Sequence, residues 1–322
     1  TNNTTFQANN IYLSNGTPPS KLNITNNGKV NSQVTILTND AIATIDAGQL
    51  NTDVLAVGYQ GTGTINTNNG AVITSAQGIN IGDASDGNAS KGSGAINVSG
   101  VNSKISSPLL GIGVKGNGQL NVSDSATVNV DGMVLGRNEA SNQGKVTVSD
   151  KGSSINISNT LIVGEYGTGK LSIENGAQLI ATNTSVGNLA GSTSSSIDIT
   201  GSESKFINND LLLIGDLSEG ALNISAGATV NSQGDITFGR VAGSQGTGLI
   251  TGDNSVLSSD SNIIVGVSGT GNLTADSASK IITSEDIYVG RDEGSNGTLL
   301  VQGKNSNIEA KILTSGGNGT GS

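Results

Sequence analysis

Glycines recur along this chain at a fixed interval, and that regularity constrains the fold more than any other feature. Each of these glycines follows a short apolar run, as in LLIG and ITFG within residues 211–239. One series advances in steps of 51 to 55 residues, at Gly58, Gly113, Gly164, Gly215 and Gly266. A second series advances in steps of 51 to 54 residues, at Gly82, Gly136, Gly187, Gly239 and Gly290. Self-similarity on this scale is typical of a solenoid or a propeller.

Each large unit divides into a short half and a longer half that resemble each other, as in 219–232 (EGALNISAGATVNS) and 246–259 (GTGLITGDNSVLSS). The true unit is therefore about 25 residues with three short strands, which is too small for a four-stranded propeller blade. The leucine-rich repeat pattern is also missing. We expect an all-β fold, a right-handed parallel β-helix (solenoid) of about 12 coils with three short strands per coil.

Composition limits the class of protein further. Only 2% of residues are aromatic and 48 are glycine, which could indicate disorder, but Val, Ile and Leu alternate with polar residues as in half-buried strands. The net charge of −10 disfavours nucleic acid as a partner. The chain has no cysteine for disulfides or thiolate metal sites. No apolar run approaches the roughly 20 residues of a membrane span.

Three regions are expected along the chain. Residues 1–54 would form irregular N-terminal capping coils, since a solenoid must cover its open end. The segment 21–33 (KLNITNNGKVNSQ) nevertheless matches 221–233 (ALNISAGATVNSQ) closely. Residues 55–310 would form five double-coil repeats, and residues 311–322 a C-terminal tail or linker.

The period of two in each strand assigns side chains to the inside or the outside of the coil. Inward columns are expected at Leu120, Leu171, Leu222 and Leu273, and at Val122, Ile173 and Ile224. Small residues should mark a narrow corner, at Ala126, Ala177, Ala228 and Ala278. The glycines that end the apolar runs should take positive φ angles where the chain turns.

Polar residues form the outward columns. One face is expected to carry Asn66, Asn121, Ser172, Asn223 and Thr274, and another face Asn97, Thr147, Asp198, Ile250 and Leu300. Asn and Thr side chains stacked in this way can hydrogen-bond along the rod or across to a second rod. Two interpretations stay open, namely a solvated face and a polar surface for another copy or a glycan.

The second series of glycines is followed by charged or amide residues: Asp83, Arg137, Asn188, Arg240 and Arg291. Further charges lie nearby, at Asp86, Glu139, Asp292 and Glu293. The loops at 83–94 and 137–144 are the longest insertions, and insertions in a solenoid map to one edge that is often the binding edge. The simpler interpretation is that Arg137 with Glu139, or Arg291 with Glu293, forms a weak surface pair.

The sequence contains none of the catalytic motifs that we considered. There is no histidine to act as a base or a zinc ligand, and no phosphate-binding GxxxxGK[ST] loop. The GTG strings at 61, 167 and 269 repeat with the coil and precede no helix, so they are turns. Calcium-binding nonapeptides are absent as well. We expect no enzyme activity, no cofactor and no metal site.

The pattern in VGEYGTGKLSIENGAQL (163–179), repeated over about residues 20–310, resembles the repeats in passenger domains of bacterial type V autotransporter adhesins of the AIDA type. The resemblance implies a right-handed parallel β-helix, secretion across the outer membrane and display at the bacterial cell surface. It also implies self-association, biofilm formation, or binding to a host matrix protein or glycan, as in virulence-related cell adhesion. A signal peptide and a C-terminal barrel are not found in this sequence, which could be one portion of a passenger.

Three functions follow as expectations. The first is an adhesin whose partner is another copy of itself on a neighbouring cell, or a host matrix protein or glycan. The second is an inert β-helical stalk that presents another domain. The third is a polysaccharide-acting β-helix enzyme, which would need clustered carboxylates together with aromatic sugar platforms, and the four Tyr, three Phe and no Trp disfavour it.

Overall fold

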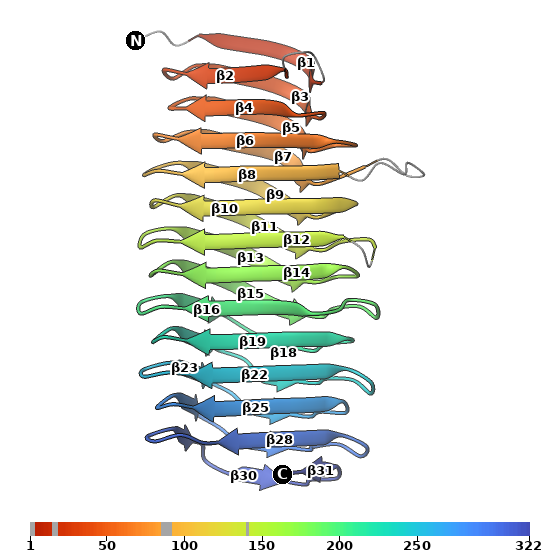
Figure 1. The fold of residues 1–322 in the computed structure, drawn as a ribbon, viewed down its shortest axis with the longest axis vertical. Helices are drawn as coiled ribbons and strands as arrows, with labels where there is room; N and C mark the ends of the chain where they lie inside the picture. The colour runs from red at the N-terminus through yellow and green to blue at the C-terminus, as the bar shows by residue number, and fades with distance from the viewer. Residues whose placement is uncertain (1–3, 15–18, 85–91, 140–141) are drawn as a thin grey trace.

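The computed structural model describes residues 4–14, 19–84, 92–139 and 142–322. These residues form strands, turns and bends only, stacked as a parallel solenoid of about 12 coils (Figure 1). The front strands run leftward in this view, the back strands return behind them, and successive coils descend. The chain therefore winds in the right-handed sense that parallel crossovers prefer.

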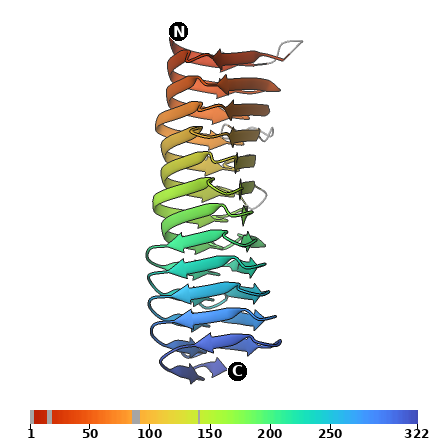
Figure 2. The same ribbon diagram turned by 90° about the vertical axis from the view of Figure 1, so that its left-hand side faces the viewer.

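The strands belong to two parallel sheets, which we call the front sheet and the back sheet (Figures 1 and 2). The front sheet contains 13 strands: β2 (Lys21–Thr25), β4 (Ala41–Asp46), β6 (Thr62–Asn68), β8 (Gly92–Ser99), β10 (Gly116–Ser123), β12 (Gln143–Ser149), β14 (Thr168–Glu174), β16 (Ser195–Thr200), β19 (Glu219–Ser225), β22 (Gln245–Thr251), β25 (Thr270–Asp276), β28 (Asn296–Val301) and β31 (Thr320–Gly321).

The back sheet contains 18 strands and changes character along the rod. Its first eight strands are long: β1 (Thr5–Leu13), β3 (Lys29–Leu37), β5 (Gln49–Val57), β7 (Val72–Ile81), β9 (Lys104–Ile112), β11 (Thr127–Leu135), β13 (Ser154–Val163) and β15 (Gln178–Val186). The later ones come in pairs: β17 (Lys205–Asn208) and β18 (Leu212–Ile214), β20 (Thr229–Ser232) and β21 (Ile236–Phe238), β23 (Val256–Ser259) and β24 (Ile263–Val265), β26 (Lys280–Thr283) and β27 (Ile287–Val289), β29 (Asn307–Glu309) and β30 (Leu313–Ser315).

The expected three short strands per coil are thus found from β16 onward, whereas earlier coils join the second and third strands into one bent strand. The bend shows as a register shift, for example between Val130 and Gly132, as a β-bulge produces. In the later coils a polar turn interrupts the strand. The buried Asn208 holds the first of these turns by donating to the carbonyl of Asp210 at 2.7 Å.

The aliphatic columns that the sequence predicts are confirmed. Leu120, Leu171, Leu222, Leu273, Val122, Ile173 and Ile224 are all fully buried. The glycines that end the apolar runs take positive φ, for instance 78° at Gly164. A side chain is excluded there as well, because an added Cβ would lie 1.9 Å from the hydroxyl of Ser195 in the next coil.

Two assignments of single residues were wrong. Ala278 is not in the corner column, because it lies in the turn with a φ of 65° and Ser279 is the buried residue. Ile250 points inward and is fully buried, while its neighbour Leu249 is the outward residue, 41% exposed. The preceding inward position is a glycine, Gly248, where neighbouring coils have leucine. Without an apolar side chain there, the alternation of inward and outward residues in this strand could not be assigned correctly from the sequence.

The two outward columns also prove to be one. Asn97 pairs in register with Asn66 on one side and with Asn121 on the other, so residues from short and longer halves alternate on the front sheet. The two halves of a unit are successive coils that follow the same path. They do not occupy different faces.

The corner column follows the two-coil repeat of the sequence from Ala71 to Ser255. Alanine and serine alternate there, at Ala71, Ser103, Ala126, Ser153, Ala177, Ser204, Ala228 and Ser255, all buried. Each serine hydroxyl accepts the N–H of a turn residue in the preceding coil, as Ser204 does from Gly176 at 2.9 Å and Ser255 from Gly227 at 3.0 Å. The serine thereby satisfies a backbone donor that the turn leaves without a strand partner.

The segments at the two ends continue the same pairing. β2 and β3 pair with β4 and β5, within the region expected to form capping coils. Within residues 311–322, β30 pairs with β27 and β31 pairs with β28. In this final coil the core columns come to the surface, and Leu313, which continues the buried Ile287, is 56% exposed.

The Ser255 hydroxyl should therefore support the stack. We expect Ser255→Ala to lower the free energy of unfolding by about 1–3 kcal/mol, because the N–H of Gly227, in a half-buried turn, loses its acceptor. Ser123→Ala is the control, since that hydroxyl only reaches the adjacent Asp124. Urea unfolding followed by circular dichroism measures both variants. Equal effects of the two substitutions would contradict the role given to the corner serine.

A second prediction concerns Phe238, whose ring fills space that Gly248 leaves where neighbouring coils have leucine. An added Cβ on Gly248 would lie 2.7 Å from the Phe238 ring and 2.6 Å from Leu273. We expect Gly248→Leu to cost about 1–3 kcal/mol by overpacking. Combining it with Phe238→Leu should recover most of that loss in thermal unfolding. A double variant as unstable as the sum of the two single variants would show that the two positions do not share this space.

Candidate binding surfaces

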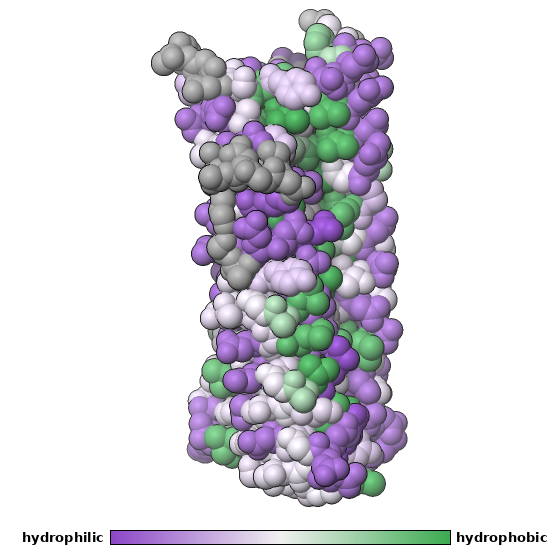
Figure 3. Space-filling view, turned by 90° about the vertical axis from the view of Figure 1, so that its right-hand side faces the viewer, coloured by the Kyte–Doolittle hydropathy of each residue, from purple (hydrophilic) through white to green (hydrophobic). Residues whose placement is uncertain are grey.

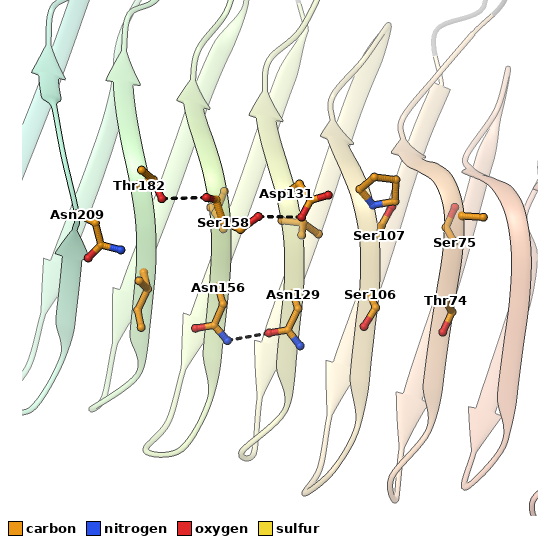
Figure 4. A pocket seen from close by; sticks show the side chains of 15 residues that line it. Thr74, Ser75, Ser106, Ser107, Asn129, Asp131, Asn156, Ser158, Thr182 and Asn209 are labelled. Atoms are coloured by element: carbon orange, nitrogen blue, oxygen red, sulfur yellow. Dashed lines mark hydrogen bonds between the residues drawn. The ribbon is translucent and has the colours of Figure 1, made fainter.

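An open groove of about 780 Å³ lies on the back sheet, where the long strands bend. Its lining residues come from six successive coils, as Figure 4 shows: Thr74, Ser75, Ala76, Ser106, Ser107, Pro108, Asn129, Val130, Asp131, Asn156, Ile157, Ser158, Ile180, Thr182 and Asn209. Most of the lining residues carry an amide or a hydroxyl group, set among apolar surface, and Asp131 is the one ionisable residue of the lining. The groove therefore offers hydrogen-bond donors and acceptors with little charge.

Sequence reasoning missed this groove, although part of its signal was readable. Asn129 and Asn156 stand at equivalent outward positions of β11 and β13, and the amide of Asn156 donates to Asn129 at 2.8 Å. The sequence analysis predicted outward asparagine columns only for the strands of the front sheet, whereas Asn129 and Asn156 lie on the back sheet. The hollow itself depends on the bend of the strands, which has no clear signature in one sequence.

The front sheet carries the asparagine ladder that the sequence predicts. The amide of Asn97 donates to Asn66 and the amide of Asn121 donates to Asn97, both at 2.7 Å. The amide of Asn223 donates to Asp198 at 2.7 Å. Three predicted site residues, Asn66, Asn121 and Asn223, therefore use amide groups to bind the neighbouring coil.

The charged residues after the second glycines lie along the edge between the two sheets. Arg137 pairs with Glu165 of the next coil at 3.6 Å, and Arg291 pairs with Asp292 at 2.8 Å. Asp83 accepts hydrogen bonds from the amide of Asn80 and the N–H of Ala84. Further predicted residues at this edge are Glu139 and Glu293, both exposed, and Asp86, which lies outside the described residues.

Arg240 belongs to a polar cluster, centred on the buried carboxylate of Asp216, that the sequence did not reveal. Its guanidinium Nε donates to Asp216, a carboxylate only 4% exposed in the preceding coil. Ser185 donates to the same carboxylate at 2.7 Å and Asn188 at 3.4 Å. This ion pair connects two successive coils. Arg240, which was predicted as a binding residue, therefore contributes to the stability of the stack.

The hydrogen bond from Arg291 lowers the pKa of Asp292, and the bond with Asp292 in turn raises the pKa of Arg291. The resulting stabilisation is present above the unfolded carboxyl pKa of about 3.9. It is lost as the pH falls through the lower folded pKa. This pair therefore contributes throughout the neutral range.

The same edge has an apolar component. Figure 3 shows hydrophobic side chains running down this side of the rod between hydrophilic borders. Tyr166 and Leu217, which closely follow the glycines Gly164 and Gly215, are 44% and 39% exposed. The edge is thus a narrow mixed surface, distinct from the polar front sheet and the polar groove.

No protein-family model, curated protein or solved structure gave a significant match to this chain. Among the described residues, no three or more acidic side chains gather closely enough to hold a metal ion. The described part of the chain also has no helix that could cross a membrane.

The Asp216 cluster gives a stability prediction. Arg240→Ala should lower the free energy of unfolding by about 2 kcal/mol, because a buried carboxylate loses its countercharge. Lys151→Ala is the matched control, since Lys151 and Glu203 form an exposed pair, with side chains 78% and 61% accessible, whose loss should cost little. Chemical denaturation at pH 7 compares the two variants. A greater loss with Lys151→Ala would refute the assignment.

Proposed function

We propose that this chain is the passenger segment of a bacterial type V adhesin, secreted across the outer membrane and displayed on the cell surface. The observation that carries the proposal is the solenoid itself, an unbroken parallel rod of about 12 coils whose outward positions are mostly polar. Its repeats resemble those of AIDA-type autotransporters. A rod of this shape exposes long faces for attachment in place of a single deep pocket.

The adhesion partner in this proposal is another copy of the chain on a neighbouring cell, or a host matrix protein or glycan. Support comes from side chains that a partner can reach on two surfaces. The groove offers free amides and hydroxyls, and the edge offers Arg137, Arg291 and the exposed Tyr166. The net charge of −10 makes nucleic acid an unfavourable partner.

An inert stalk is the alternative, and one observation favours it. The amides of Asn97 and Asn121 are occupied by hydrogen bonds to neighbouring coils, as expected for a face that only stiffens the rod. We give the stalk second place because the groove on the back sheet keeps unused polar groups. An enzyme acting on polysaccharide comes third, since the groove lining contains a single carboxylate, Asp131, where glycoside hydrolysis uses two.

Display of residues 1–322 on a non-adherent Gram-negative cell tests the proposal. We expect the displaying cells to aggregate or to coat immobilised matrix protein or glycan, unlike cells that display an unrelated solenoid of similar length. Mixing fluorescent displaying cells with unlabelled non-displaying cells separates the two modes. Aggregates that exclude the non-displaying cells indicate self-association. Displaying cells that neither aggregate nor coat any surface would favour the stalk and contradict adhesion.

A further inference from the structure

We propose that the groove on the back sheet binds an uncharged, extended polysaccharide that lies along the axis of the rod. This inference rests on the proposed adhesive function and gives it one ligand class and one site. The groove is lined by residues from six successive coils, so it is elongated in the direction in which the coils stack (Figure 4). A linear polymer fits this direction better than a compact ligand does.

One row of residues in the groove has unused hydrogen-bonding capacity: Thr74, Ser106, Asn129 and Asn156, which are register partners on successive strands. Within the described residues, the side chains of Thr74 and Ser106 donate or accept no hydrogen bond from the protein. Asn129 keeps its amide N–H₂ group free, and Asn156 keeps its amide oxygen free, since their single mutual bond uses the other halves. Groups of this kind pair well with sugar hydroxyls, which both donate and accept.

The neighbouring row in the groove is occupied by the protein and therefore rigid. Ser158 donates to Asp131 at 2.8 Å, and Thr182 donates to the carbonyl of Ser158 at 2.9 Å. Ser107 donates to the carbonyl of Leu109 at 2.8 Å. One row thus holds the shape of the groove while the other row is available to a ligand, an arrangement that lowers the cost of ordering the site on binding.

The charge of the groove favours a neutral ligand. Asp131 is the only ionisable residue in the lining, no lysine or arginine lies there, and the whole chain has a net charge of −10. An anionic polymer would be repelled and would find no cation to pair with. A neutral polymer meets amides, hydroxyls, the single carboxylate of Asp131 and aliphatic surface such as that of Ile180 and Pro108.

The spacing of the coils also suits a linear sugar polymer. Successive coils place equivalent side chains about 4.8 Å apart, which is close to the advance of one sugar unit in an extended β-linked chain. Each of four successive sugars can then meet a hydroxyl or an amide of the row from Thr74 to Asn156. An extended peptide is a weaker fit, because peptides add to sheets at an edge and this groove lies on a face whose backbone groups are already paired.

Isothermal titration of the whole chain with neutral β-linked gluco-oligosaccharides of six units tests the site. Heparin and a Ser/Thr-rich peptide serve as comparison probes. We expect the neutral hexasaccharide to bind and both comparison probes to fail. The double variant Asn129→Ala/Asn156→Ala should weaken binding about tenfold, from the loss of two hydrogen bonds. Ser106→Tyr, which blocks the groove, should abolish binding.

The control is Asn97→Ala/Asn121→Ala on the front sheet, which removes two asparagine ladder bonds of 2.7 Å without touching the groove. Circular dichroism establishes that the variants fold. The inference is overturned if the hexasaccharide does not bind, if the control weakens binding as much as the groove variant does, or if heparin or the peptide binds instead. If the groove variant no longer binds the hexasaccharide but cells that display it still aggregate, the adhesive function is retained and belongs to another surface of the rod.

Discussion

The structure depends on one constraint, which is that the backbone of each strand finds its ladder of hydrogen-bond partners in the coils above and below. A parallel ladder of this kind obliges every coil to follow the path of its neighbour, and equivalent residues are then stacked in columns. The glycines with positive φ, the buried leucines and the corner residues recur for this reason. Where one coil departs from the pattern, a neighbour compensates, as Phe238 does for the missing side chain of Gly248.

The same constraint decides which polar side chains remain available. On the front sheet, Asn97 is hydrogen-bonded through both its amide nitrogen and its amide oxygen, so it contributes to the stiffness of the rod. In the groove, the ladder stops after one bond between Asn156 and Asn129, and the side chain of the adjacent Ser106 makes no hydrogen bond to the described part of the chain. Side-chain amides therefore stabilise the stack on the front sheet, whereas in the groove amides and hydroxyls are available to a ligand.

Much of the fold could be predicted from the sequence because columns of like residues leave a periodic signal. The leucines such as Leu222 and the glycines such as Gly164 were placed correctly. The errors came where the phase was ambiguous. Gly248 hid the inward position of Ile250, and Ser279 was passed over for Ala278. The groove and the Asp216 cluster were missed because both arise between coils, from a bend of the strand and from a residue in the preceding coil.

The register between coils can be tested directly, because the chain has no cysteine of its own. Thr147 and Ser172 are register partners on adjacent front strands, and Asp198 lies one coil further on. Partners on adjacent strands are about 4.8 Å apart, within the Cα range of a disulfide. The pair Thr147→Cys/Ser172→Cys should oxidise to an intramolecular disulfide, whereas Thr147→Cys/Asp198→Cys, two coils apart, should not. Equal cross-linking of both pairs, or of neither, would contradict a solenoid with this register.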